Sequence, residues 1–374
     1  MINTIRTWWS RLPNAAQITL VAALVILFPF VIDIAESAIR AAGGNLALLT
    51  QVNRALIYVV LALGLNIVVG FAGMLDLGYA AFFAIGAYAF GILTYPSHGI
   101  QMSFFLALWV CAAIASFFGI VVGSPTLRLR GDYLAIVTLA FGEIIPTVVR
   151  NLDDLTNGSQ GLTPIGKPSF GVFEGLFGLE PGALNVGVDP HFWFYVIALL
   201  VALVLFCTLR LDNSRIGRAW KAIREDQTAA DFMGVDPIRA KLSAFAIGAS
   251  FSGLAGVVFA SMLGAIFPDL FRFQVSIFLL IIVVFSGLGS VWGVLIGGLI
   301  ISLFDGLFLA QILNQVLPSG SENLRWVFFG IGLIFFMIFR PQGLFPRKVK
   351  GRVLTEEEAL AANATASTAA KGGD

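Results

Sequence analysis

The sequence predicts an all-α, polytopic membrane protein with about ten transmembrane helices. Three observations support this fold class. The chain of 374 residues is 58% hydrophobic, and only 12% of its residues are charged, whereas soluble domains have about 25%. Apolar stretches long enough to cross a bilayer recur along most of its length. Lysine and arginine gather in a few of the segments between these stretches, as positive-inside topology requires.

The apolar stretches define the expected helices in chain order. The first follows a basic N-terminus and lacks a small-residue cleavage motif near its end, so we expect an uncleaved first span. The stretches on either side of residues 287–291 are compatible with two helices or with one broken helix. The expected spans are approximately 17–36, 53–71, 77–95, 103–123, 132–149, 192–209, 241–261, 274–287, 291–313 and 325–340.

The segments between the spans predict the orientation. The N-terminus, the loop with Arg128 and Arg130, the loop at about 210–241 and the C-terminal tail are basic. With ten spans, all four lie on one side, which the positive-inside rule identifies as the cytoplasm. The loop at about 150–191 is rich in glycine, proline and acidic residues, and we expect it outside.

The sequence predicts one domain and a tail. Residues 1–350 are expected to form one transmembrane permease domain, because no segment is long enough for a separate soluble domain. Residues 351–374 are small and polar, so we expect a disordered cytoplasmic tail. Both termini are predicted to lie in the cytoplasm.

The basic loop between the sixth and seventh spans holds the densest run of charge in the sequence. Apolar side chains recur in it at helical spacing, Trp220 among them. Ser214 can cap the start of a helix, and Gly234 can end it in a left-handed turn. Asp236 and Pro237 fit the N-cap and first residue of the next helix. An ordered cytoplasmic helix is therefore favoured over a solvated loop that only supplies positive charge.

Enzymatic chemistry and cofactor binding have no supporting motif. The two histidines are isolated, and each cysteine lies within an apolar run, so neither a metal site nor a disulfide is expected. The segment from Gly161 to Lys167 begins like a phosphate-binding loop, but Pro168 stands where a magnesium-binding Ser or Thr is needed. The basic residues form no stripe for nucleic acid. We expect no catalytic residue, no cofactor and no metal in this chain.

Four polar residues lie within or at the edges of the apolar stretches: Asn66, Asp76, Glu143 and Asp305. An ionised side chain at mid-bilayer costs about 3 kcal/mol on insertion scales, so these groups should face protein or water. We consider them candidates for a translocation path. For Glu143, a hydrogen bond to a neighbouring helix is an equally weighted structural alternative.

Two glycine-rich breaks interrupt the apolar pattern, one at residues 70–78 and one at residues 286–293. Such breaks are typical of a path through a transporter. Close helix packing through small residues is at least as common an explanation.

Several blocks of sequence also occur in a recognisable order. The segment TAADFMG, Thr228 to Gly234, resembles the E-A-A-x-x-x-G loop of bacterial ABC importer permeases, with Thr228 where that signature has Glu and with Glu225 one turn earlier. Over about residues 50–346, the chain is similar to LivM-type permeases of the branched-chain amino-acid ABC transporter family. The blocks that carry this similarity are GFAGMLDLGYAAFFAIGAYA, RLRGDYLAIVTLAFGEII, LTNGSQGL, RIGRAWKAIREDQTAADFMGV, FSGLGSVWGVLIGG and RPQGLFP.

The resemblance implies the ABC importer permease fold and a membrane-spanning subunit that imports branched-chain or related amino acids across the bacterial inner membrane. The ATP would be bound by partner subunits. The implied partners are a LivH-like permease, two cytoplasmic ATPases of the LivG and LivF types, and an amino-acid-binding protein outside. Loop 210–241 would be the coupling loop. Its expected ATPase-coupling residues are Arg218, Trp220, Arg224, Glu225, Ala229, Ala230 and Gly234.

Two other functions stay open. LivM-like permeases for urea or short amides are the closest alternative, because the polar residues of the spans do not separate these cargoes. An ion-coupled secondary transporter is less favoured, since the intramembrane charges are scattered and such a protein needs no docking helix.

Overall fold

The computed structural model describes residues 14–41, 47–96, 99–100, 102–126, 132–165, 189–309, 322–340 and 343–345. This part of the chain is built of helices, with one isolated antiparallel bridge between Leu162 and Ile266. The central part of the expected external loop (166–188) and the expected disordered tail (351–374) lie outside the described residues.

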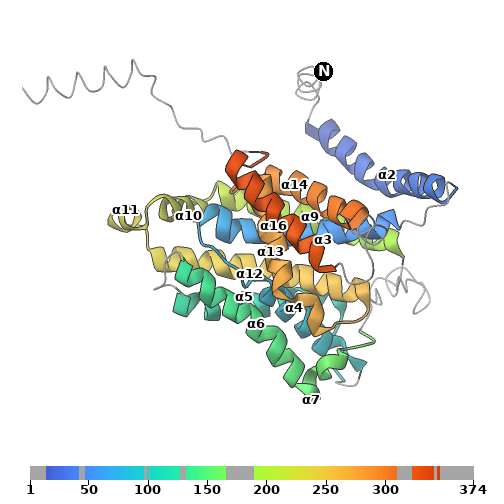
Figure 1. Cartoon of the computed structure of the whole chain (residues 1–374), viewed down its shortest axis with the longest axis horizontal. Coiled ribbons are helices and arrows are strands. Elements are labelled where there is room, and N and C mark those ends of the chain that lie inside the picture. Colours follow the sequence, from blue (N-terminus) through green and yellow to red (C-terminus); the bar gives the residue numbers. More distant parts are fainter. Residues whose placement is uncertain are drawn as a thin grey trace, which may run out of the picture.

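Three helical segments form the centre of the bundle (Figure 1). They are α3 (Leu48–Leu65) with its π-helical extension η1 (Asn66–Phe71), α4 (Tyr79–Thr94) and α12 (Pro237–Leu263). Glycines permit their close approach: a Cβ on Gly86 of α4 would overlap the backbone of Gly253 in α12. Such small-residue crossings favour helix association where lipid offers no hydrophobic driving force.

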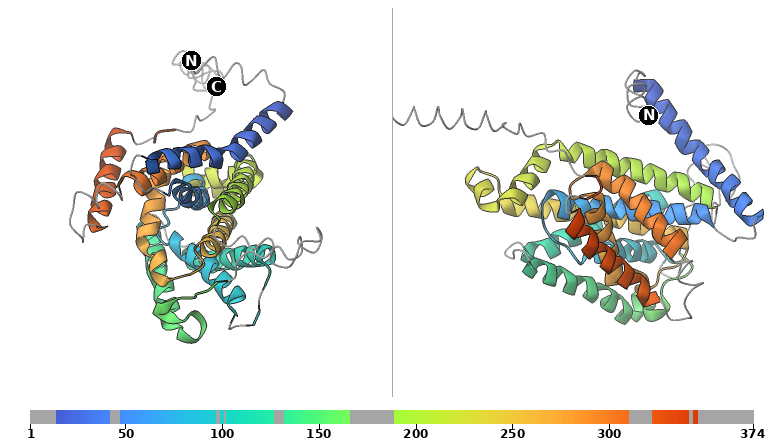
Figure 2. Two further views of the ribbon diagram at one scale, coloured as in Figure 1. Left: turned by 90° about the vertical axis from the view of Figure 1, so that its right-hand side faces the viewer. Right: turned by 45° about the horizontal axis from the view of Figure 1, so that its top comes forward.

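The remaining long helices surround this centre and expose apolar side chains such as Trp109, Leu199 and Trp292. An exposed apolar surface of this kind suits contact with lipid. Viewed along α3 and α12, α2 lies across the outside of the bundle (Figure 2). The surrounding helices are α2 (Asn14–Ala41), α5 (Phe104–Thr126), α6 (Asp132–Asn151), α9 (Pro190–Asp212), α13 (Phe273–Ser286), α14 (Val291–Leu303) with η5 (Phe304–Leu309), and α16 (Glu322–Phe339).

Each of the expected spans corresponds to a helix in the part of the chain that the structure describes. Within the described ranges, six helical segments are long and apolar enough to cross a membrane by themselves, and three further apolar helices are shorter. The pair at 287–291 is two helices and not one broken helix. Gly287 and Gly289, with φ of +111° and +80°, form a tight turn between α13 and α14, and Gly297 of α14 packs directly on Ser286.

The two polar loops lie at opposite ends of the bundle. With 27 residues, α12 is about 40 Å long. The short helices α10 (Arg215–Glu225) and α11 (Gln227–Phe232) pack at its N-terminal end. At its C-terminal end, the amide N–H of Ile165 donates a hydrogen bond to the carbonyl of Gly264 (3.2 Å). The C-terminal end of α6 and the segment 151–165 therefore lie at the end far from α10.

Candidate coupling and translocation site

The charged loop is ordered, but it forms two helices where the sequence predicted one. Ser214 caps α10 by accepting a hydrogen bond from the Gly217 N–H at 3.1 Å, and Gly234 has a φ of +84°, so both predicted ends are confirmed. The break lies at Asp226, which starts α11 with its carboxylate. One oxygen accepts from the N–H groups of Thr228 (2.7 Å) and Ala229 (3.0 Å). This cap satisfies amide groups that an uninterrupted helix would bond internally.

Trp220 anchors α10 to the bundle. Its side chain is 0% exposed, and its indole N–H donates to the carbonyl of Ala240 (2.9 Å) and to the Ser243 hydroxyl (3.0 Å) in α12. Its ring also stacks on Phe71 of η1, with centroids 6.4 Å apart. Of the residues predicted to couple to an ATPase, Trp220 and Ala230 are therefore buried against this chain, which assigns them an anchoring position in this conformation.

The other predicted coupling residues are exposed: Arg218, Arg224, Glu225, Ala229 and Gly234. Two further exposed side chains were missed by the sequence reasoning. Phe232 and Met233 are 88% and 84% exposed at the tip of α11. The available signal was the placement of two large apolar residues directly before the glycine that ends the helix.

Arg224 extends in the other direction, toward the membrane helices. Its Nη1 donates a hydrogen bond to the carbonyl of Gly70 in η1. Gly73 leaves room for its aliphatic stem, because a Cβ there would lie 2.8 Å from Arg224 Cγ. The α10–α11 loop is thus attached through Trp220 to α12 and through Arg224 to the first glycine-rich break.

Among the described residues, the hydrogen bonds and ion pairs of the four translocation candidates join none of them to another. Asn66 is buried and accepts a hydrogen bond from the Gly289 N–H at 2.9 Å. Asp76 is buried in the segment before α4 and accepts from the Gly78 N–H at 2.9 Å. These two candidates have structural partners in this conformation.

The other two candidates differ from each other in exposure. Asp305, in η5, is buried and forms an ion pair with Arg325. The Glu143 side chain, on α6, is exposed. A path role for these residues stays a prediction.

Glu143 belongs to a polar stripe on the exposed side of α6. Thr147 and Asn151 follow at four-residue intervals and are also exposed. The Thr147 hydroxyl donates to the Glu143 carbonyl (2.9 Å), and the Asn151 amide donates to the Thr147 carbonyl (2.9 Å). Near the C-terminal end of this stripe, Arg150 forms an ion pair with Asp269 at 2.7 Å. Because polar groups on lipid-facing helix surfaces are costly, this stripe is better suited to water or another protein.

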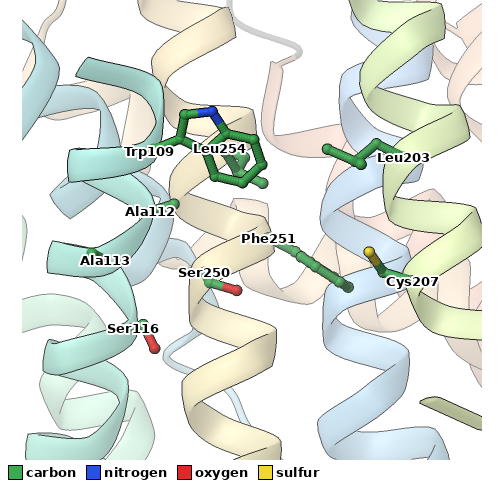
Figure 3. A pocket seen from close by; sticks show the side chains of 9 residues that line it. All are labelled: Trp109, Ala112, Ala113, Ser116, Leu203, Cys207, Ser250, Phe251 and Leu254. Atoms are coloured by element: carbon green, nitrogen blue, oxygen red, sulfur yellow. The ribbon is translucent and has the colours of Figure 1, made fainter. Parts of the chain in front are cut away.

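A hollow of about 330 Å³ lies between α5, α9 and α12 (Figure 3). Its lining is mainly apolar, and none of the four translocation candidates contributes to it. The lining residues are Trp109, Ala112, Ala113, Ser116, Leu203, Cys207, Ser250, Phe251 and Leu254. Both cysteines are free. Within the described residues, no group of His, Cys, Asp and Glu side chains could hold a metal ion.

Comparison with known proteins identifies the family of the chain. Residues 47–337 match the model of the family described as branched-chain amino acid transport system / permease component. The chain is 39% identical over 308 residues to the high-affinity branched-chain amino acid transport system permease protein LivM of Salmonella typhimurium, covering 78% of this chain and 68% of the relative. The same values hold for LivM of Escherichia coli K12. LivH of Salmonella typhimurium is 27% identical over 297 residues, covering 78% of this chain and 91% of that protein. No solved structure matches the chain.

The family match covers most of the membrane bundle, from the start of α3 into α16, and includes both glycine-rich breaks and the α10–α11 loop. The chain therefore belongs to the family of branched-chain amino acid transport permease components and is a multi-pass membrane permease subunit.

Proposed function

We propose that this chain is one of two permease subunits of an ATP-driven importer of branched-chain amino acids in the bacterial inner membrane. A LivH-like permease forms the other half of the path, two cytoplasmic ATPases supply the energy, and a binding protein delivers cargo from outside. The observation that carries this proposal is the α10–α11 loop: it is ordered, firmly attached to the bundle, and ends in an exposed apolar tip.

The tip has the chemistry of a docking surface. Phe232 and Met233 are exposed at the end of the α10–α11 loop. In the sequence, the exposed Asp231 directly precedes them, and the exposed Asp236 and Arg239 follow. Aromatic residues and methionine are enriched in protein interfaces, where a polar rim surrounds an apolar centre. A folded partner that covers this tip removes it from water, and an ATPase subunit is the partner that the family implies.

The orientation follows from charge. The α10–α11 end carries the basic loop, and the far end carries the acidic segment that begins after α6. We therefore place α10 in the cytoplasm. Single cysteines at Thr228 and Ser159, both exposed positions, should react from opposite sides of the membrane when Cys111 and Cys207 are replaced. Reaction of both with an impermeant reagent added outside contradicts this orientation.

The polar stripe of α6 supplies the wall of the path. Glu143 and Thr147 face outward from the bundle, so a hydrated space between two permease subunits allows them to remain solvated. The stripe ends close to Arg150 and Asp269 at the outer end of α6. Cargo released by a binding protein would first meet this charged end and then the stripe.

Branched-chain amino acids are the proposed cargo because the relatives named above are permeases for them. Urea or short amides are the alternative cargo. The Glu143 stripe offers hydrogen bonds to either class, so the cargo is decided by transport competition and not by the stripe.

Docking is tested with a paired substitution. Phe232→Asp with Met233→Asp should abolish co-purification of the ATPase subunits and substrate-stimulated ATP hydrolysis, because two charges replace the apolar centre of the interface. Leu155→Asp is the matched control: Leu155 is 41% exposed but lies at the opposite end of the bundle. Unchanged ATPase binding by the paired variant contradicts the docking role.

A further inference from the structure

The two glycine-rich breaks, far apart in sequence, meet in one junction beside the coupling loop. Asn66 Oδ1, at the start of η1, accepts the N–H of Gly289 in the turn between α13 and α14. Gly70 and Gly289 pack backbone to backbone, since a Cβ on Gly70 would lie 2.6 Å from Gly289 N. The Asn66 Nδ2 group is buried and has no hydrogen-bond partner among the described residues. The side chain therefore contributes to the junction through its oxygen alone.

Arg224 of α10 reaches the same junction. Its guanidinium donates to the Gly70 carbonyl, and a Cβ on Gly289 would lie 3.2 Å from Arg224 Nη1. One side chain of the coupling loop therefore contacts η1 and the α13–α14 turn together. A hydrogen bond from a charged donor is about twice as strong as a neutral one, which suits a mechanical connection.

A third element closes the junction from the C-terminal side. The N–H groups of Leu344 and Phe345 donate to the carbonyls of Phe285 (2.8 Å) and Ser286 (3.1 Å) at the end of α13. Gly343, with φ of +80°, packs so closely on Gly287 that a Cβ would overlap its backbone. The segment 343–345, part of the RPQGLFP block, thus caps the last carbonyls of α13.

We propose that these contacts form a relay in which displacement of α10 moves both glycine-rich breaks as one body. Asn66 is the positioning residue that joins the two breaks, Arg224 links them to the coupling loop, and segment 343–345 holds the α13–α14 turn in place. The relay rests on the proposed function, because it requires that an ATPase moves α10.

The arrangement explains why the breaks contain glycine. The turn between α13 and α14 has two residues at positive φ, where side chains are disfavoured and the backbone rather than side chains makes the contacts. Backbone contacts keep a fixed geometry as the assembly moves. Motion of α10 consequently reaches α4, through the segment after η1, and α14, through the Gly289 turn.

The first test separates coupling from docking. Asn66→Leu removes the acceptor for the Gly289 N–H. Asn66→Asp keeps an acceptor oxygen in the same place and replaces the amide nitrogen by a second carboxyl oxygen, and burial favours the neutral form of that carboxyl group. In liposomes with the whole complex, we expect Asn66→Leu to bind the ATPases and hydrolyse ATP, while uptake per ATP falls about fivefold or more. Asn66→Asp should lie closer to the parent. Parental uptake per ATP in Asn66→Leu overturns the relay.

The second test replaces the Arg224 contact by a covalent link and decides the matter if Asn66→Leu fails to assemble. The built Cβ of Gly73 lies 3.2 Å from Arg224 Cβ, slightly below the separation of about 3.5–4.5 Å that a disulfide needs. Gly73 has a φ of +70°, where side chains are disfavoured, and the single variant Gly73→Cys measures the effect of that strain alone. In a background without Cys111 and Cys207, the pair Gly73→Cys with Arg224→Cys should couple poorly when reduced. Oxidation should restore uptake per ATP to within about twofold of the cysteine-free parent.

The single-cysteine variants under the same oxidant are the controls. Lower uptake after oxidation contradicts a rigid relay, and so does parental coupling in the reduced protein. Failure of the proposed function has a different signature: the ATPases then do not bind the parent chain either.

Discussion

Removing the indole of Trp220 should detach the coupling loop while leaving the membrane bundle intact. Trp220→Ala deletes a fully buried ring that stacks on Phe71 and donates to Ala240 and Ser243. The side chain contacts this chain and not solvent, so its loss acts on the attachment of α10 and not on a docking surface.

The size of the effect can be worked out from these contacts. Truncating a buried tryptophan to alanine costs about 3–5 kcal/mol, because the cavity persists. Trp220→Phe keeps an aromatic ring against Phe71 and loses the indole hydrogen bonds to Ala240 and Ser243. The Ala240 carbonyl keeps the Ser243 hydroxyl as a donor at 2.8 Å, so the cost is about 0.5–1.5 kcal/mol for each lost bond. The predicted order of damage is therefore alanine, then phenylalanine, then the parent.

This order can be measured in three ways: by limited proteolysis of α10–α11, by ATPase co-purification and by the melting temperature of the complex. Trp220→Ala should insert normally, become cleavable between α10 and α12, and lose most bound ATPase, while Trp220→Phe should retain part of it. If Trp220→Ala resists protease and binds ATPase like the parent, the anchoring role derived from its burial is wrong.

Three further substitutions have definite expectations. Glu143→Gln should lower uptake while ATPase binding stays unchanged. The control Asp154→Asn changes an exposed carboxylate at the far end of the bundle and should have no effect. If Glu143→Gln takes up substrate as fast as the parent, Glu143 has a structural role only. A Cβ at Gly234 would meet nothing within 4 Å, so the cost of Gly234→Val comes from the φ of +84° and is about 1–2 kcal/mol. The variant should show reduced substrate-stimulated ATP hydrolysis. Gly234→Asn should largely avoid this loss. Gly86→Val should prevent stable folding because its side chain would overlap Gly253, whereas Gly330→Val in α16, with nothing within 4 Å of the added Cβ, should express normally; comparable yields of both variants contradict the tight α4–α12 crossing.

Much of the architecture is predictable because it depends on local pattern. Apolar run length located the helices, and the ends of the charged loop followed from the capping chemistry of Ser214 and Gly234. The start of α12 was also expected from Asp236 and Pro237, and Asp236 accepts from the Ile238 and Arg239 N–H groups there. Each of these features is set by residues within one or two helical turns of each other.

The features that sequence pattern did not reveal depend on contacts between distant residues. Trp220 was expected on a docking face, but its partners in α12 and η1 make it an anchor. Asn66 was considered for the path, although its acceptor role toward Gly289 spans 223 positions. The helix break at Asp226 was missed because an Asp inside one continuous helix and an Asp that caps a second helix can occur in segments of the same composition.

Uptake of labelled leucine into liposomes is the most direct test of the central claim. The liposomes contain this chain, its companion permease, both ATPases and the binding protein. Uptake should require ATP, persist after proton and sodium gradients are collapsed, and be competed by isoleucine and valine but not by urea. Leucine uptake that needs an ion gradient and no ATP contradicts the ABC importer assignment, and competition by urea or short amides in place of valine contradicts the proposed cargo.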